Sequence, residues 1–328
     1  MSSPNTTTMK SASELVTSYA ALIKNKTILT TGVSPGTLGG YFVQSIAKAQ
    51  PACLILAGRN DTKLEECKGD IQAISPETKV RTLKMDLDSL QSVRAAADQV
   101  NSWADIPAID VLVNNAGIMA VEYGLSVDGF EKQLATNHLA PFMFTNMIMD
   151  KILKSESPRV VNVSSDGHRL SPIRFADPNF EDGKTYNKWV AYGQSKTANM
   201  LLALSLASKL GVKHELLAFS LHPGVIATNL GNHLDWSVDL GGLQSTDKSL
   251  GNAEGWREFS FKTPDQGIAT HVFASFDPSL KVNNGAYLID ARVADPLSDT
   301  VKPWATSLLE AERMWRLSEE LVGEEFKY

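Results

Sequence analysis

Two residues able to move a proton between them, Tyr192 and Lys196, stand four positions apart. In a helix this spacing places both side chains on one face, one above the other. A free tyrosine titrates near pH ~10, too high for easy proton exchange at neutrality, and a nearby ammonium favours the phenolate. The spacing therefore predicts that Tyr192 is a general acid–base whose pKa is lowered by Lys196. A shift of two units would correspond to about 2.7 kcal/mol.

A second chemical feature is a glycine-rich turn that follows the apolar stretch 27–31. Glycines allow a tight turn and a close approach of the backbone to a pyrophosphate, which the first N–H groups of a following helix can bind. We expect this turn to bind a dinucleotide through Gly32, Ser34, Gly36, Thr37, Leu38 and Gly39.

Arg59 follows the next apolar stretch, 52–57, where NAD-binding proteins usually carry a carboxylate for the ribose hydroxyl. A planar cation suits a 2′-phosphate instead. The cofactor expected is therefore NADP (NADPH). If Arg59 does not make this contact, Ser34 and Lys63 are the alternatives.

The elements that must position these residues alternate between short apolar runs and amphipathic stretches. The expected strands are Thr27–Thr31, Ala52–Ala57, Val80–Met85, Ile109–Val113, Arg159–Val163, Glu215–Leu221 and Ala286–Ile289. The expected helices are Ser13–Ile23, Gly39–Gln50, Asp61–Ile74, Ser89–Trp103, Phe130–Lys154, Tyr192–Leu210, Asp265–Ser275 and Trp304–Val322. This alternation predicts an α/β fold: a single-domain, doubly wound parallel sheet with helices on both faces.

One domain is expected over 26–328, preceded by an N-terminal extension, 1–25, with a short helix capped by Ser13. Residues 230–263 are polar and glycine-rich with two embedded tryptophans, and we expect an irregular loop that covers the substrate.

Bulk properties exclude several partners. The net charge is −6 without a basic stripe, so nucleic acid is not expected. Met1–Lys10 resembles neither a signal nor a transit peptide, and no segment approaches the ~20 apolar residues of a spanning helix, so no membrane is expected either. Cys53 and Cys67 fit no metal or redox spacing, and they indicate reduced thiols in a cytoplasmic protein.

The ordered set of motifs resembles the short-chain dehydrogenase/reductase family. It comprises Thr31-Gly32-x-x-x-Gly36, Asn114-Asn115-Ala116-Gly117, Tyr192-x-x-x-Lys196 and Pro223-Gly224. The segments 159–165, 191–199, 221–230 and 284–290 further resemble the retinol-dehydrogenase and WW-domain-oxidoreductase branch. The resemblance runs from Lys26 to Val322.

The resemblance implies hydride transfer between NADP(H) and a small-molecule carbonyl or alcohol substrate. By it, Ser165 orients the carbonyl, with Ser164 as the alternative, and Asn137 holds a water in a proton relay to Lys196. It also implies further cofactor contacts, in addition to Tyr192 and Lys196: Asp86, Asn114, Ala116, Gly117, Pro223, Val225 and Thr228. A homodimer is expected on the same ground.

The chain departs from the family pattern twice. Leu38 stands where the family's turn has its third glycine, and Gly39 comes one residue later, which indicates a one-residue insertion. Ser165 and Tyr192 are 27 residues apart, more than in minimal members, and the insert contains Phe175, Phe180, Tyr186 and Trp189. These aromatic residues favour a bulky apolar or aromatic substrate.

Two other functions stay open at the level of sequence. One is an NADP(H)-binding sensor or scaffold protein without turnover, against which the intact Ser165, Tyr192 and Lys196 argue. The other is an NAD-dependent epimerase or dehydratase, against which Arg59 argues. A G-x-S-x-G elbow for hydrolysis and a Walker lysine for ATP chemistry are both missing from the sequence.

Overall fold

The computed structural model describes residues 10–328. Its main sheet has the strand order β10-β9-β6-β5-β4-β1-β2-β3, and every neighbouring pair is parallel except β9 with β10. A second small sheet joins β7 and β8. The strands are β1 (Thr27–Thr31), β2 (Cys53–Gly58), β3 (Lys79–Lys84), β4 (Val111–Asn114), β5 (Arg159–Val163), β6 (Leu217–His222), β7 (Val225–Ile226), β8 (Phe261–Lys262), β9 (Tyr287–Ile289) and β10 (Arg292–Val293).

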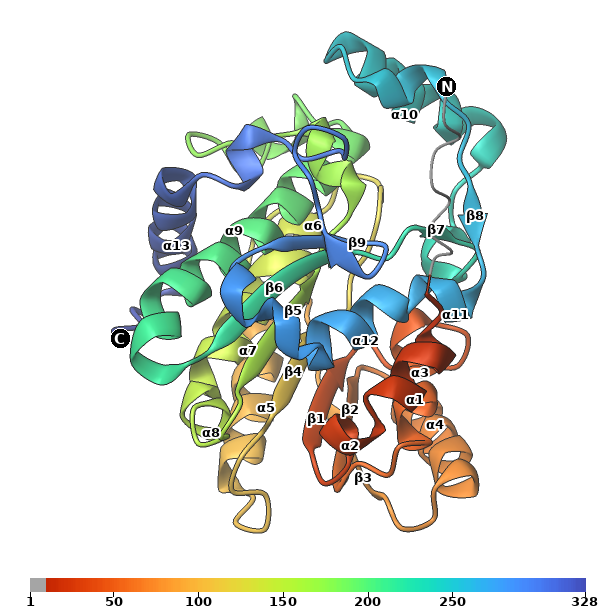
Figure 1. Ribbon diagram of the computed structural model, residues 1–328. Helices are drawn as coiled ribbons and strands as arrows, with labels where there is room; N and C mark the ends of the chain where they lie inside the picture. The colour runs from red at the N-terminus through yellow and green to blue at the C-terminus, as the bar shows by residue number, and fades with distance from the viewer. Residues whose placement is uncertain (1–9) are drawn as a thin grey trace.

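Helices cover both faces of the main sheet (Figure 1). The α-helices are α1 (Ala12–Ser18), α2 (Ala20–Ile23), α3 (Leu38–Ala47), α4 (Asp61–Ile74), α5 (Leu90–Ser102), α6 (Lys132–Leu134), α7 (Ala140–Met147), α8 (Met149–Ile152), α9 (Lys188–His214), α10 (Trp236–Ser249), α11 (Pro264–Gly267), α12 (Ala269–Phe276) and α13 (Leu308–Val322). The tighter or wider turns are the π-helix η1 (Ala135–Leu139) and the 3₁₀ helices η2 (Asp166–Leu170), η3 (Glu181–Gly183), η4 (Asn229–Gly231), η5 (Ala253–Trp256), η6 (Pro278–Asn283) and η7 (Pro303–Ala305).

Two apolar cores lie on the two faces of the sheet. One face packs α1, α3, α4 and α12 through residues such as Phe42, Leu64 and Val272. The other packs α5, α7, α9 and α13 through residues such as Phe142 and Trp315. Burial on both faces explains why the central strands are continuous apolar runs. The doubly wound α/β fold predicted from the sequence is confirmed.

The strand order reverses between β1 and β4, which are neighbours although β2 and β3 separate them in the chain. In open α/β sheets the loops that follow the strands on either side of such a reversal diverge and leave a ligand crevice. The loops after β1, β4, β5 and β6 carry most of the predicted site residues. The topology therefore gathers these residues at the carboxyl-terminal ends of the strands.

Several expected elements differ in detail. The N-terminal helix is capped by Ser11, not Ser13, because the Ser11 side chain and Glu14 form a capping box. The polar start over 1–9 lies outside the described residues. The expected helix Phe130–Lys154 is divided into α6, η1, α7 and α8, with η1 forming a π-helical turn at Asn137.

The stretch 230–263 is not the irregular loop that its glycines suggested. It contains the 14-residue helix α10, whose first turn is capped by Asp235. Gly241 and Gly242 are tolerated within α10, although glycine costs a helix interior about 1 kcal/mol each. Figure 1 shows α10 at one end of the molecule, away from the two helical layers.

Candidate active site

Tyr192 and Lys196 lie in the first half of α9, which begins at the N-cap Asn187. Both are nearly inaccessible, at 6% and 4% exposure. The Lys196 ammonium nitrogen lies 5.6 Å from the centre of the Tyr192 ring. The four-residue spacing thus places the two side chains together, as the sequence indicated.

Ser165 lies beside the Tyr192 ring through the turn that follows β5. It caps η2, and its hydroxyl oxygen accepts a hydrogen bond from the Gly167 N–H at 3.0 Å. A Cβ atom at Gly167 would lie 2.8 Å from Cε1 of Tyr192 and 3.2 Å from the Ser165 hydroxyl oxygen. Only a glycine therefore fits between these two side chains.

The Ser164 hydroxyl already donates a hydrogen bond to the backbone of α9. The acceptor is the backbone carbonyl of Lys196 at 2.7 Å, and Ser164 is 2% exposed. Ser164 thus fastens β5 to α9, whereas Ser165 presents its oxygen beside the tyrosine.

Asn137 lies on the π-helical turn η1, a feature that is frequent at functional sites. Its side-chain carbonyl accepts from the Ile118 N–H at 2.8 Å, and its amide donates to the Ile118 carbonyl and to the Ser195 hydroxyl, both at 2.9 Å. A Cβ atom at Gly117 would lie 3.0 Å from Asn137 Oδ1 and 3.3 Å from Lys196 Nζ. Asn137 therefore lies next to Lys196, with only Gly117 between them.

The electrostatics of the pair correct one expectation. Burial raises the pKa of Tyr192 to about 12, and its hydrogen bond with Ser165 opposes this only in part. Burial also lowers the pKa of Lys196 to about 8. The Lys196 ammonium donates to the Val163 carbonyl at 3.1 Å. In the protein alone the pKa of Tyr192 is thus raised and not lowered, because the cost of burying a phenolate exceeds the effect of the Ser165 hydrogen bond.

The glycine-rich turn joins β1 to α3. Gly32 and Gly36 both have φ near +72°, which favours glycine. Thr37 caps α3 by accepting from the Gly40 N–H at 3.2 Å. No acceptor within residues 10–328 takes the N–H groups of Leu38 and Gly39. Free N–H groups at the start of a ten-residue helix fit a pyrophosphate.

Gly39 explains the one-residue departure from the family turn. A Cβ atom there would lie 2.6 Å from Asn115 Nδ2 and 2.7 Å from the Gly32 carbonyl oxygen. Gly39 is therefore required for close packing of α3 against the segments that follow β4 and β1.

The Asn114–Gly117 segment is bound to the neighbouring strands. The Asn114 amide donates to Thr145 Oγ1 and Asn162 Oδ1, both at 2.9 Å, so this side chain joins β4 to α7 and β5. Ala116 donates its N–H to the Thr31 hydroxyl at 3.1 Å and lies against Gly32. Asn114 is thus a structural residue by its side chain, and Ala116 and Gly117 form the wall beside the glycine turn.

Arg59 and Asp86 lie at the ends of β2 and β3. Arg59 is exposed and forms no ion pair with any residue from 10 to 328. Asp86 does not cap α5, because Ser89 does so. Its carboxylate accepts instead from the Asp88 N–H at 3.1 Å.

Pro223–Thr228 follows β6. Gly224 has φ of +96°, Val225 begins β7, and the Thr228 hydroxyl caps η4. A Cβ atom at Gly267 would contact both Ile226 and Leu38, at 2.6 and 3.4 Å. This segment therefore approaches the first residue of α3, and the structure brings together the predicted segments after β1, β4 and β6.

A charged cluster beside Ser165 was missed by sequence reasoning. Arg169, 2% exposed on its side chain, donates to both carboxylate oxygens of Asp247 at 2.9 and 2.8 Å. Its Nη1 lies 2.8 Å from Asp166, whose carboxylate accepts from the Ser165 hydroxyl at 3.2 Å. Burial alone would lower the pKa of Arg169, but Asp166 and Asp247 raise it by more. Arg169 and Asp247 are 78 positions apart, and no motif in the sequence links them.

The cluster joins η2 to helix α10. Asp247 belongs to α10, and Asn252 donates to the Arg169 carbonyl at 3.2 Å. Lys302 in turn donates to Asn252 Oδ1 at 2.7 Å. Arg169 is thus the point at which η2, α10 and the segment before η7 meet.

This fold with a tyrosine–lysine pair at the carboxyl edge of the sheet defines a class of oxidoreductases, and the comparisons agree. The model of the short chain dehydrogenase family matches residues 26–176. Human retinol dehydrogenase 14 is 33% identical over 316 residues, 92% of this chain and 88% of that protein. The chain belongs to the short-chain dehydrogenase/reductase family and resembles its retinol dehydrogenase branch.

Other relatives extend the likeness over nearly the whole chain. The short-chain dehydrogenase/reductase prx1 of Penicillium rubens is 34% identical over 307 residues, 90% of this chain and 84% of that protein. A crystal structure of an uncharacterised protein from Mycobacterium paratuberculosis superimposes with a TM-score of 0.70 at 28% identity, covering 94% of this chain and 98% of that one. Among residues 10–328, the helices are all too short or too polar to cross a membrane.

Proposed function

We propose that the protein is an NADP(H)-dependent oxidoreductase that interconverts a carbonyl and an alcohol. Membership of the family makes it an oxidoreductase that uses a nicotinamide cofactor. The observation that carries the finer proposal is the contact of Ser165, Gly167 and Tyr192 beside the buried Lys196.

In this proposal the bound cofactor supplies a hydride to the carbonyl carbon, and the protein supplies the proton. Tyr192 donates its phenolic proton to the carbonyl oxygen, and the reverse transfer accompanies oxidation. A pKa of about 12 keeps Tyr192 protonated at neutral pH, which suits a proton donor. Ser165 donates its hydroxyl hydrogen to the same oxygen and so orients the carbonyl.

Lys196 and Asn137 support the proton transfer. The positive charge of Lys196 opposes the cost of the phenolate that forms when the proton leaves. With a pKa of about 8, Lys196 can itself exchange a proton near neutral pH. Asn137 holds the wall of the site at Ile118 and Ser195, and a water beside it would complete the relay.

Residues at the carboxyl edge of the sheet would hold the cofactor. The free N–H groups of Leu38 and Gly39 would bind the pyrophosphate. Arg59, exposed and without an ion pair among the described residues, would bind the 2′-phosphate. Asp86 would contact the adenine, and Val225 and Thr228 the nicotinamide end.

The substrate in this proposal is a bulky apolar carbonyl or alcohol. An apolar cluster of Ala120, Leu170, Trp189, Leu234 and Leu243 lies between η2 and α10. Trp236 at the start of α10 and Phe261 on β8 expose 46% and 68% of their surface. The relatives named as retinol dehydrogenases support an apolar substrate of that kind.

The test compares the protein with Tyr192→Phe on a panel of apolar aldehydes and ketones, with NADPH oxidation as the readout. The variant should fold and bind NADPH but lose turnover by roughly 10²–10⁴. Tyr328→Phe, at the C-terminal end, is the matched control and should keep full activity. Equal rates of NADPH oxidation by the unaltered protein and by Tyr192→Phe would contradict the mechanism. Cofactor binding without turnover on any substrate would favour the sensor function.

A further inference from the structure

The residue that follows Ser165 carries a carboxylate without a role in the proposed reaction. Asp166 begins η2, and its Oδ1 accepts the hydrogen bond that the Ser165 hydroxyl donates at 3.2 Å. The Ser165 oxygen accepts at the same time from the Gly167 N–H at 3.0 Å. A serine hydroxyl has a single hydrogen. Asp166 therefore takes that hydrogen, while Gly167 fixes the position of the oxygen.

The Asp166 carboxylate is held in place from two sides, and the first is η2 itself. Asp166 Oδ2 lies 2.8 Å from Arg169 Nη1. Arg169 uses Nε and Nη2 for the two carboxylate oxygens of Asp247, so the guanidinium that holds Asp166 is itself fixed by a bidentate contact. Ser165, Asp166, Arg169 and Asp247 thus form one continuous chain of polar contacts from η2 to α10.

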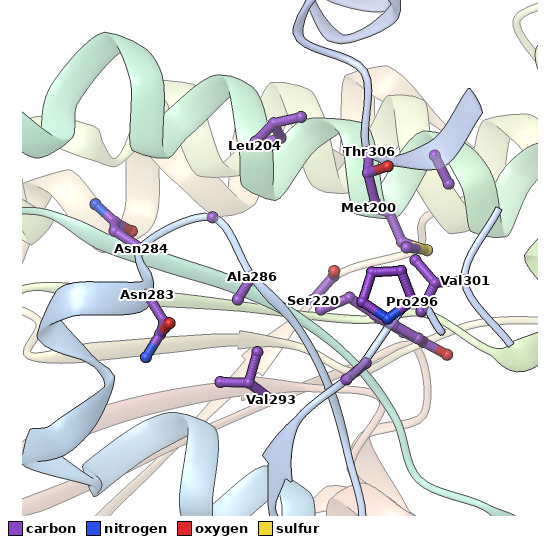
Figure 2. A pocket seen from close by; sticks show the side chains of 14 residues that line it. Met200, Leu204, Ser220, Asn283, Asn284, Ala286, Val293, Pro296, Val301 and Thr306 are labelled. Atoms are coloured by element: carbon purple, nitrogen blue, oxygen red, sulfur yellow. The ribbon is translucent and has the colours of Figure 1, made fainter. Parts of the chain in front are cut away.

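The second side is formed by β6. Ser220 of β6 and Met200 of α9 line one cavity, so this face of β6 is the face that α9 covers (Figure 2). His222 follows Ser220 by two residues and therefore shares that face. Its Nε2 lies 3.8 Å from Asp166 Oδ1. Burial would raise the pKa of Asp166, but His222 and Arg169 lower it by more, so the carboxylate is ionised at neutral pH and can only accept hydrogen bonds.

We propose that Asp166 is a positioning residue: its carboxylate, fixed by Arg169, holds the Ser165 hydroxyl until the carbonyl oxygen of the substrate takes the hydrogen. This inference rests on the proposed function, in which Ser165 donates to that oxygen. Without Asp166 the hydroxyl is free to turn toward other acceptors, and an entering carbonyl meets a donor of undefined direction.

Asp166→Asn removes the acceptor without changing the size of the side chain. Arg169 binds the amide oxygen, which leaves the amide nitrogen facing Ser165, and that nitrogen donates but cannot accept. We expect kcat/KM for carbonyl reduction to fall about tenfold. The fall should lie more in kcat than in KM, since Ser165 acts on the reacting oxygen. Rates are compared at pH 7, where a pKa of about 12 keeps Tyr192 protonated.

A double-mutant cycle separates positioning from a structural role. In Ser165→Ala there is no hydroxyl for Asp166 to hold, so the addition of Asp166→Asn should change the remaining rate less than about twofold. A structural carboxylate would lower the rate by the same factor with or without the Ser165 hydroxyl. That result would overturn the proposal, and so would an unchanged rate in Asp166→Asn alone.

Asp105→Asn is the matched control. Asp105 is an ion-paired carboxylate beside Lys79, the first residue of β3, and so lies at the opposite ends of the strands from Ser165. Its kcat/KM should equal that of the unaltered protein. If Asp166→Asn does not fold, Asp166→Glu takes its place, because it keeps a charge for Arg169 and moves the carboxylate by one methylene group. The same cycle with Ser165→Ala then applies.

A second measurement does not depend on turnover. The thiol introduced by Ser165→Cys would donate to the same carboxylate, which raises the pKa of the thiol. Adding Asp166→Asn should lower that pKa by about one unit, measured from the pH dependence of alkylation by iodoacetamide, with the unaltered protein as the blank for the buried Cys53 and Cys67. An unchanged thiol pKa would overturn the inference. Absence of turnover in the unaltered protein would instead contradict the proposed function.

Discussion

At the scale of single residues, the proposed proton transfer requires Lys196 to be charged. Its pKa is lowered to about 8 by burial, so the ammonium is lost as pH rises through that value. We expect the rate of carbonyl reduction to fall above pH ~8. In Lys196→Arg the positive charge persists above this pH. The fall in rate at high pH should therefore disappear, even though the overall rate is lower. The measurement is kcat for reduction between pH 6 and 10, and an unchanged fall in the variant would assign it to another group.

Cofactor choice also depends on one residue. If Arg59 binds the 2′-phosphate, its charge-assisted hydrogen bonds contribute about 1.5–3 kcal/mol, which is roughly a tenfold to hundredfold preference for NADPH. Arg59→Ala should erase most of this preference by weakening NADPH, and Arg59→Asp should favour NADH. Dissociation constants for both cofactors at one ionic strength test this. Equal loss of both would make Arg59 structural, and an unchanged ratio would move the contact to Ser34 or Lys63.

Sequence reasoning succeeded where neighbours in the chain are neighbours in space. Tyr192 and Lys196 share a helix face, and the glycines after β1 serve a local turn, so spacing alone predicts their placement. The pKa of Tyr192 was predicted in the wrong direction, because burial depends on packing from η2 and the rest of the fold. Spacing carries no measure of that burial.

At the scale of elements, helix α10 is attached to η2 by the buried ion pair between Arg169 and Asp247. Asp247→Asn would leave Arg169, whose side chain is 2% exposed, with one fewer charged partner. Breaking a buried pair in this way lowers the free energy of unfolding by about 3 kcal/mol. We expect a raised KM for apolar substrates with a smaller change in kcat, since α10 bears no proton-transferring group. Asp247→Glu should recover part of the affinity.

Asp239→Asn is the matched control on the same helix. Asp239 pairs with Lys188 at 2.5 Å near the surface, where solvent screens such pairs and they contribute little to stability. Its KM should stay close to that of the unaltered protein. If both variants raise KM equally, the charge of α10 matters and its attachment to η2 does not.

Neither α10 nor its attachment could be read from the sequence. Gly241 and Gly242 made the sequence of this helix resemble a loop, although Asp235 caps its first turn. The Arg169–Asp247 contact joins segments 78 positions apart, and only the folded chain brings them together. The strands β7, β8 and β10 have two residues each, too few for any periodicity to appear.

At the scale of the whole molecule, buried histidines make stability depend on pH, and four of them, His222 included, have a pKa that burial lowers. Burial lowers the pKa of His138 to about 3 and those of His168 and His271 to about 4. Between these values and ~6.5, the unfolded chain binds protons that the folded protein does not, so stability is present above pH ~6.5 and is lost as pH falls. From pH 6.5 to 5 each histidine costs about 2 kcal/mol at about 1.4 kcal/mol per unit.

Urea unfolding at pH 7 and pH 5 measures this effect. His138→Gln should reduce the difference between the two pH values by about 2 kcal/mol, because one buried titrating group is removed. His233→Gln is the control, since His233 is exposed and should leave the difference unchanged. An equal pH difference in both variants would show that carboxylates cause the acid sensitivity.

The position of α13 has a consequence for the order in which the chain is synthesised. Trp315 and Phe326 pack edge-on against Phe142 of α7, and the Ser205 hydroxyl of α9 donates to the Ala311 carbonyl at 3.1 Å. The ribosome synthesises α7 and α9 before α13. The apolar faces of α7 and α9 therefore stay exposed until residues 308–328 emerge. During that interval the helix that carries Tyr192 and Lys196 exposes an apolar surface to which chaperones and other nascent chains can bind. A stop codon before Leu308 would make this interval permanent.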